Sequence, residues 1–377
     1  MKINKVIAVI LFACMLVNVL VGCGNKQDTI KIVMAGPLTG NSAQWGEAMK
    51  KGVELAVEQI NDRGGVLGKK VEASYEDDKG DPKEAVNVAQ RIATNADYVG
   101  VIGHYFTSCT MAASPVYQKA GIPEIAVAST NPEATAAGDY IFRINPTNTH
   151  QGAGIVEWLV KEQNKKRIAF IYVNDDYGKG IFDIAKNTAI DLGVEVVFEG
   201  TTAPSGEQDF SVLISNVMNS NPDALVILSF YAVGAQLLIQ SNKMGLDVLI
   251  VGSDGIYSPD LIKIAGDAAE GTYVATWFHP DNDAPLTVQY LKDYEEMHGE
   301  PSDTWAPYAY VATMVLADAI ERAGTTERSK VRDALKETKQ FESPVGTITF
   351  DENRVPDVKD LTLLFTQVTD GDFKLIK

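Results

Sequence analysis

The stretch YVGVIGHYFTSCT, residues 98–110, carries the pattern that decides the fold. Residues 99–102 read as a buried strand, followed by a glycine and a short polar loop. Residues 111–119 have a helical pattern, with Pro115 expected near the start of that helix, where proline is tolerated. The loop therefore lies where a strand ends and a helix begins.

Such a junction suits an anion, because its backbone N–H groups are unpaired and the helix dipole is positive there. Thr107, Ser108 and Thr110 can add hydroxyl donors. We expect this loop to bind the acid group of a small molecule. The alternative is that these hydroxyls only cap the helix.

Strands and helices alternate on both sides of this stretch. Before and after it, strands are predicted at 31–35, 71–75 and 123–128. Helices are predicted at 45–61 and from Pro82 onward, and the helix that begins at residue 111 is expected to end at Gly121. This order implies a parallel sheet covered on both faces, with ligands bound beyond the carboxyl ends of the strands. We therefore expect three polar strand-end loops, at residues 37–44, 105–110 and 129–132, to converge on one edge.

The same pattern begins again after residue 146. Strands are predicted at 167–173, 195–199, 224–228, 248–251 and 271–277, and helices at 152–163, 179–192, 209–218 and 234–244. Three further helices (286–297, 308–322 and 329–339) precede terminal strands at 346–350 and 361–368. The predicted fold class is α/β, with two doubly wound parallel-sheet lobes joined by a multi-crossover hinge, its segments near 143–149, 278–280 and 351–356.

The N-terminus has the features of an export signal. Lys2 and Lys5 precede an apolar run over residues 6–21 that is short for a membrane span. The run ends Leu-Val-Gly-Cys23, which resembles a bacterial lipobox. We therefore expect a lipoprotein signal peptide at 1–22, lipidation of Cys23, and a polar tether at 23–28, so that the protein is extracytoplasmic and anchored to the cell membrane. The alternative is an ordinary signal peptide with an incidental cysteine.

Composition limits the classes of function. The 377 residues suit about two domains, and a net charge of −17 argues against nucleic acid as a partner. With Cys14 removed and Cys23 modified, Cys109 has no partner for an intramolecular disulfide, and we expect a buried, inert thiol.

Several longer motifs resemble one family. They are VMAGPLTG at 33–40, INDRGGVLG at 60–68, Glu76-Asp77-Asp78 followed by Asp81-Pro82, Ala128 to Pro132, Asp176-Tyr177-Gly178, Asp209-Phe210-Ser211 and Gly252-Ser253-Asp254-Gly255. From residue 30 onward the chain resembles the type I periplasmic binding proteins of branched-chain amino-acid ABC importers. The resemblance implies a two-lobed clamshell, with 29–146 plus 278–350 as lobe 1 and 147–277 plus 351–377 as lobe 2.

The resemblance also implies ligand-binding roles. Thr107 takes the place of a carboxylate-binding serine, with Ser108 adjacent, and Asp254 takes the place of an acidic partner of the ammonium. The remaining expected contacts are the backbone of Ala128, Thr130 with its neighbour Ser129, Tyr177 and Tyr231 closing from lobe 2, and Trp45 as an aromatic wall.

The residues themselves agree with these roles. A zwitterion needs a cation site and an anion site, because either charge is costly to bury unpaired. The loops of lobe 1 offer hydroxyls and amides, and lobe 2 offers a carboxylate at a strand end. Tyr105, Phe106, Phe230 and Phe278 are further candidates for the walls. Each assigned residue also has an ordinary reading as a cap, turn or core residue, and Asp254 and Thr107 depart from the Glu and Ser usual in the family.

The predicted function is a lipid-anchored receptor that delivers an aliphatic amino acid to ABC permease and ATPase subunits. We expect a monomer. We also expect no cofactor, no metal and no enzymatic activity, because nucleotide-binding, metalloprotease and hydrolase motifs are absent and the four histidines are scattered. His104, near the expected site, reads as loop structure. Two alternatives stay open: a binding protein for another small carboxylate or amide (urea, a short amide or an aromatic acid), and a ligand sensor for a membrane partner.

Overall fold

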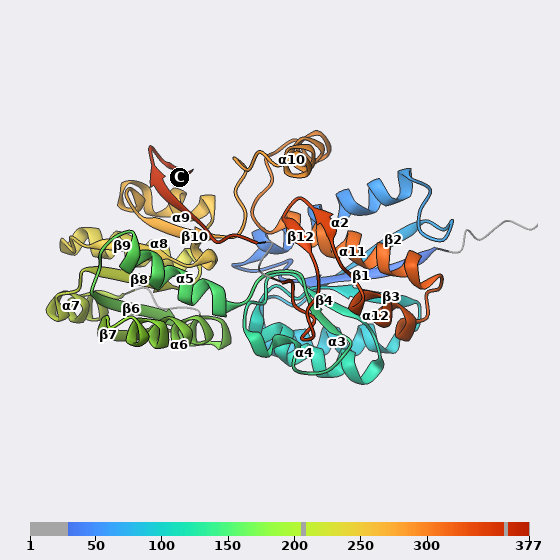
Figure 1. The fold of residues 1–377 in the computed structure, drawn as a ribbon, viewed down its shortest axis with the longest axis horizontal. Helices are drawn as coiled ribbons and strands as arrows, with labels where there is room; N and C mark the ends of the chain where they lie inside the picture. Colours follow the sequence, from blue (N-terminus) through green and yellow to red (C-terminus); the bar gives the residue numbers. More distant parts are fainter. Residues whose placement is uncertain (1–28, 205–208, 358–360, 377) are drawn as a thin grey trace, which may run out of the picture.

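The computed structural model describes residues 29–204, 209–357 and 361–376. In this part of the chain two lobes lie side by side along the long axis, each built around its own sheet (Figure 1). The predicted signal peptide, the tether and Cys23 lie outside the described residues.

The sheet of lobe 1 has the strand order β2-β1-β3-β4-β5, and all neighbours are parallel. On β1, Ile32 and Met34 face one core while Val33 and Ala35 face another, as expected for a strand covered on both sides. Helices α2 and α11 pack together in the first core, and α3 and α4 in the second. The elements are β1 (Ile30–Gly36), α2 (Ala43–Asp62), β2 (Val71–Asp77), α3 (Pro82–Thr94), β3 (Tyr98–Ile102), α4 (Thr107–Ala120), β4 (Glu124–Ala126), β5 (Ile141–Arg143) and α11 (Ala306–Ala323).

The sheet of lobe 2 has the order β14-β13-β10-β9-β8-β6-β7. Its strands from β7 to β10 are parallel, whereas β13 and β14 are antiparallel to their neighbours. Helices α5 and α6 pack together, and α8 packs on α7 and α9. The elements are α5 (Asn148–Lys161), β6 (Arg167–Val173), α6 (Asp176–Asp191), β7 (Glu195–Thr202), α7 (Ser211–Ser220), β8 (Ala224–Leu228), α8 (Tyr231–Met244), β9 (Leu249–Gly252), α9 (Pro259–Ala265), β10 (Tyr273–Thr276), β13 (Leu364–Thr369) and β14 (Asp372–Leu375).

The chain passes between the lobes more than once. It leaves the lobe 1 sheet after β5 and enters α5, and after β10 it returns to α10 (Pro285–His298), which packs on α2. Helix α12 (Arg328–Lys336) and the hairpin β11 (Phe341–Ser343) and β12 (Gly346–Ile348) follow α11, before the chain reaches β13. The cleft between the lobes is thus bordered by several connecting segments.

The prediction of two α/β lobes is confirmed, with two corrections. Helix α4 begins at Thr107, not at residue 111, so the predicted polar loop is largely the first turn of the helix and Pro115 lies in the helix interior. The last two strands of lobe 2 are antiparallel, so that its sheet is mixed. No helix of the described ranges is long and apolar enough to cross a membrane.

Candidate functional site

A small cavity lies between the lobes, at the carboxyl ends of the strands. Space for the centre of a water molecule amounts to about 10 Å³, barely enough for one water. Its side chains therefore nearly fill it, and an amino-acid-sized ligand enters only if they or the lobes move. The lining residues are Tyr105, Phe106, Thr107, Ala128, Tyr177, Phe230, Asp254, Gly255 and Trp305. We call this the inner cavity.

Lobe 1 contributes hydrogen-bond donors to this region. Thr107, in the first turn of α4, is 2% exposed, and its Oγ1 has no hydrogen-bond partner among the described residues. Thr130, in the loop after β4, is fully buried, and its Oγ1 is likewise without a described partner. Thr107 therefore does not cap its helix, and two buried hydroxyls remain available to another group. Such groups are uncommon in folded proteins and call for an explanation.

Lobe 2 contributes a carboxylate. Asp254 follows β9 and begins the short 3-10 helix η2 (Asp254–Ile256). The Tyr177 hydroxyl, from the first turn of α6, donates to Asp254 Oδ1 over 2.6 Å and lies 2.9 Å from Ser253 Oγ. It also accepts the Gly255 N–H at 2.9 Å. Tyr177 thus fixes the orientation of this carboxylate.

The other oxygen of Asp254, Oδ2, is buried and has no hydrogen-bond partner among the described residues. Burial raises the pKa of Asp254 to about 6, although the Tyr177 hydroxyl lowers it. Gln151, fully buried on α5, also lowers this pKa, but no hydrogen bond of normal geometry joins it to the carboxylate. At neutral pH the inner cavity therefore has an ionised carboxylate on one side and hydroxyl donors on the other.

Aromatic rings form the remaining walls. Tyr105 stacks on Trp45 with ring centroids 4.7 Å apart. Phe230, from lobe 2, contacts Phe106 and Trp45 edge-on at 5.1 and 5.8 Å and stacks on Tyr177 at 5.1 Å. These rings make an apolar surface suited to a hydrophobic ligand side chain.

The lobes also touch through polar contacts. The Tyr231 hydroxyl donates to the Asn41 carbonyl at 3.1 Å, and Gln44 Nε2 donates to Ser258 Oγ at 3.3 Å. The Asn131 side chain donates to the carbonyl of Asp176 at 2.9 Å. The structure is therefore a closed arrangement of the two lobes.

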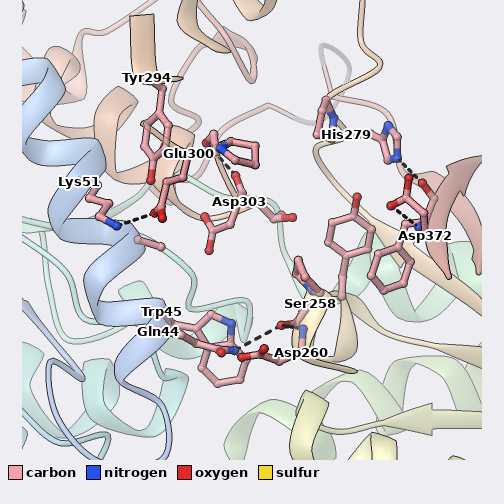
Figure 2. A pocket seen from close by; sticks show the side chains of 18 of the residues that line it. Gln44, Trp45, Lys51, Ser258, Asp260, His279, Tyr294, Glu300, Asp303 and Asp372 are labelled. Atoms are coloured by element: carbon pink, nitrogen blue, oxygen red, sulfur yellow. Dashed lines mark hydrogen bonds and ion pairs between the residues drawn. The ribbon is translucent and has the colours of Figure 1, made fainter. Parts of the chain in front are cut away.

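A second cavity, the outer cavity, opens beside Trp45 and has about 670 Å³ of space by the same measure. Figure 2 shows Gln44, Trp45, Ser258 and Asp260 close together at one end of it, and Asp303 toward the other end. Lys51 is paired with Glu300 at 2.5 Å, and Lys374 with Asp372 at 2.6 Å. Most of its charged groups are exposed to water or paired with one another. Asp303 is the exception, because burial raises the pKa of its carboxyl to about 6, and its Oδ1 accepts the backbone N–H groups of Trp305 and Ala306.

The structure brings four of the nine predicted ligand-binding residues together around the inner cavity. Thr107, Ala128, Tyr177 and Asp254 line the inner cavity. Trp45 backs Tyr105 and lines the outer cavity, and Tyr231 forms the contact with Asn41.

The remaining predicted residues lie outside the inner cavity. Ser108, Thr130 and Phe278 are not part of its lining, and Ser129 Oγ is bonded to Thr110 Oγ1 at 2.5 Å. Two residues were missed by sequence reasoning: Trp305, which lines the cavity, and Gln151. Neither carries a local signal, because only the tertiary fold brings the start of α11 and α5 to this point.

Two other reactive side chains near the inner cavity, Cys109 and His104, are buried in the protein core. Cys109 is fully buried, as predicted, and burial raises the pKa of its thiol. His104 is fully buried, with Nδ1 2.6 Å from Asp78 Oδ2 and Nε2 3.1 Å from the Tyr117 hydroxyl. No group of three or more His, Cys, Asp or Glu side chains in the described residues is arranged to hold a metal ion.

Comparison with known proteins points in one direction. Residues 29–372 match the family described as periplasmic binding protein. The leucine-, isoleucine-, valine-, threonine- and alanine-binding protein of Pseudomonas aeruginosa is 35% identical over 344 residues, covering 91% of each chain. The leucine-specific-binding protein of Salmonella typhimurium is 33% identical, over 82% of this chain and 84% of its own.

Solved structures agree. A leucine binding protein from Thermotoga maritima superposes with a TM-score of 0.85 at 29% identity, over 92% of this chain and 98% of its own. A branched-chain amino acid transporter substrate binding protein from Streptococcus pneumoniae, in complex with isoleucine, has the same TM-score at 27% identity, over 92% and 99%. These similar proteins are binding proteins, in agreement with the expectation that the chain is not an enzyme.

Proposed function

We propose a function for this chain, which belongs to the periplasmic binding protein family: it binds an aliphatic, branched-chain amino acid between its two lobes. One observation carries the proposal. Thr107 Oγ1 from lobe 1 and Asp254 Oδ2 from lobe 2 are buried, lack partners among the described residues and belong to residues that line the same cavity. A hydroxyl suits a carboxylate and an aspartate suits an ammonium, so the pair matches a zwitterion.

In this proposal the ligand carboxylate is bound by Thr107, Thr130 and the backbone at Ala128, and the ammonium by Asp254. Ser129 supports the first group through Thr110, and Ser108 lies at its edge. Tyr177 orients Asp254, while the rings around Trp45 and Phe230 contact the ligand side chain. Because each ligand charge belongs to a different lobe, the ligand stabilises the closed state by its differential affinity.

We further propose that the protein is the membrane-anchored component of an importer. Lobe 1 comprises 29–146 plus 278–350 and lobe 2 comprises 147–277 plus 351–377, and their closed form delivers the amino acid to ABC permease and ATPase subunits. Cys23 carries the lipid. If so, Cys23→Ser moves the protein from the membrane fraction to the soluble fraction; unchanged fractionation contradicts the anchor.

Calorimetry against the twenty amino acids tests the ligand class. We expect binding to leucine, isoleucine or valine, or to a small set of close relatives. Binding of none of the twenty contradicts the proposal.

An aromatic acid is the second candidate ligand, because five of the nine residues that line the inner cavity have an aromatic side chain. Such a ligand leaves Asp254 Oδ2 without a cationic partner, which makes it the weaker candidate. Titration with benzoate and with a short amide in the same experiment separates these ligands from an amino acid.

A further inference from the structure

Arg143, the last residue of β5, is fully buried behind the loop that follows β4. Its Nη1 donates to the carbonyls of Ser129 at 3.0 Å and Asn131 at 2.7 Å. Among the described residues, Nε and Nη2 have no hydrogen-bond partner, and no carboxylate lies within ion-pair distance of this guanidinium. Within the described structure, both hydrogen bonds of the guanidinium therefore go to one loop.

The guanidinium is charged at neutral pH. Burial lowers the pKa of Arg143 to about 9, and the nearby charge of Asp351 acts in the opposite direction. A buried charge without an ion pair destabilises a fold, so that packing alone does not account for an arginine here.

In the loop at 128–131, three of the four backbone carbonyls accept a hydrogen bond within the described structure, whereas the backbone N–H groups are free. Arg143 binds the carbonyls of Ser129 and Asn131, and the Thr130 carbonyl accepts the Asn148 N–H at 2.7 Å. None of the four backbone N–H groups has an acceptor among the described residues, and Thr130 Oγ1 has none either. Free backbone N–H groups are good hydrogen-bond donors to an anion.

The contact with Ser129 has a second effect. The Ser129 carbonyl and the Thr130 N–H belong to the same peptide unit, so a charged donor on the carbonyl polarises the unit. Hydrogen bonds in such chains strengthen one another, which makes the Thr130 N–H a better donor. The positive charge that the loops of lobe 1 lack is thus supplied from behind, through a peptide.

We propose that Arg143 is the positioning residue of the carboxylate site: it holds the carbonyls of Ser129 and Asn131 away from the ligand and strengthens the Thr130 amide toward the acid group of the ligand. This inference rests on the proposed function only in placing a carboxylate ligand at this loop. It holds for an amino acid and for an aromatic acid alike.

Arg354 supplies a matched control. It donates from Nε to the Ile141 carbonyl and from Nη2 to the Thr135 carbonyl, both at 2.9 Å, so it binds the same strand but not the loop. Arg143→Gln removes the charge behind the loop, Arg143→Lys retains it, and Arg354→Gln removes a neighbouring charge.

The test measures affinity for leucine and leucinamide, and for benzoate and benzamide, together with hydrogen exchange of the amides at 128–131 in the free protein. For whichever acid binds, we expect Arg143→Gln to weaken it at least tenfold more than its amide, Arg143→Lys to restore part of the loss, and Arg354→Gln to change neither ratio. Equal losses for acid and amide, or the same ratio in Arg143→Gln and Arg354→Gln, overturn the inference.

The exchange measurement separates this inference from the proposed function. If the wild-type protein binds benzoate but no amino acid, the proposed function fails, while the acid-to-amide ratio still tests Arg143. If neither acid binds, hydrogen exchange of the amides at 128–131 tests the role of Arg143. Faster exchange in Arg143→Gln than in Arg354→Gln supports the positioning role, and equal exchange overturns it. Should Arg143→Gln not fold, Arg143→Lys is compared with the wild type by the same criteria.

Discussion

The two lobes present different groups to the inner cavity: lobe 1 has hydrogen-bond donors and lobe 2 has a carboxylate. Lobe 1 presents a neutral donor, Thr107, has a second free hydroxyl at Thr130 in the adjoining loop, and keeps the cation Arg143 behind that loop. Lobe 2 presents a carboxylate, Asp254, that is held by Tyr177 and has one oxygen without a described partner. Neither side by itself satisfies a zwitterion, so selectivity for an amino acid is a property of the closed pair of lobes.

The largest expected effect comes from the lobe 2 side. Asp254→Asn removes the partner of a buried ammonium, which costs about 2–5 kcal/mol of binding, or roughly 30-fold to several thousandfold in affinity for leucine. Calorimetry with leucine and with 4-methylpentanoate, which lacks the amine, checks the assignment. Asp260→Asn, in the outer cavity, is the control and is expected to leave leucine binding unchanged. Similar losses for both ligands would assign Asp254 a general structural role.

The substitution Asp254→Asn also changes how the stability of the ligand-free protein depends on pH. The pKa of Asp254 is raised from 3.8 to about 6 in the folded state, so the unfolded chain ionises first as pH rises. Ionisation of Asp254 therefore lowers the free energy of unfolding of the ligand-free protein as the pH rises from 4 to 6. Above pH 6 the reduction is about 3 kcal/mol.

We thus expect Asp254→Asn to raise the melting temperature of the free protein at pH 7 and to have little effect at pH 4. Thermal unfolding at both pH values, without ligand, provides the measurement. A lower melting temperature for the variant at pH 7 would show that the ionised carboxylate is already compensated within the protein.

On the lobe 1 side, Thr107→Val replaces the free hydroxyl with a methyl group of similar size. Losing a hydrogen bond to a charged group costs about 1.5–3 kcal/mol, or roughly 10- to 150-fold in affinity for leucine. Ser108→Ala, one residue along the same helix and outside the cavity lining, is expected to stay within about twofold. Larger losses in Ser108→Ala than in Thr107→Val would exchange the roles of the two hydroxyls.

The smallest effect is expected at the contact between the lobes. Tyr231→Phe removes the hydrogen bond to the Asn41 carbonyl and keeps the edge contact with Trp45. A neutral hydrogen bond contributes about 0.5–1.5 kcal/mol, so affinity falls roughly two- to tenfold through a less stable closed state. Calorimetry gives the affinity, and scattering of the free protein should show a larger radius of gyration. An unchanged affinity would mean that this contact does not limit closure.

The course of the chain was predictable because its strands and helices have strong periodic patterns. Strand β6, for example, was predicted with the bounds that it has, and Asp254 was placed correctly at a strand end. The start of α4 was not predicted, because its N-cap, Phe106, has no capping side chain and the hydroxyls of Thr107 and Ser108 suggested a loop. The α4 N-terminus thus has no side-chain cap, and the Thr107 hydroxyl has no partner among the described residues.

Contacts between distant segments had no local signal. Arg143 lies on a strand of three residues that read only as a crossing segment, and its partners at Ser129 and Asn131 follow a different strand. Trp305 reaches the inner cavity from the start of α11, far along the chain. Such positions depend on how β5 and α11 pack, which periodicity alone does not specify.

The central claim is tested most directly by a crystal structure of the protein with leucine bound. The account predicts the ligand in the inner cavity, with its ammonium within hydrogen-bond distance of Asp254 Oδ2 and its carboxylate within that distance of Thr107 Oγ1 and the Thr130 amide. Leucine bound in the outer cavity, or in the inner cavity with its carboxylate toward Asp254, would contradict it.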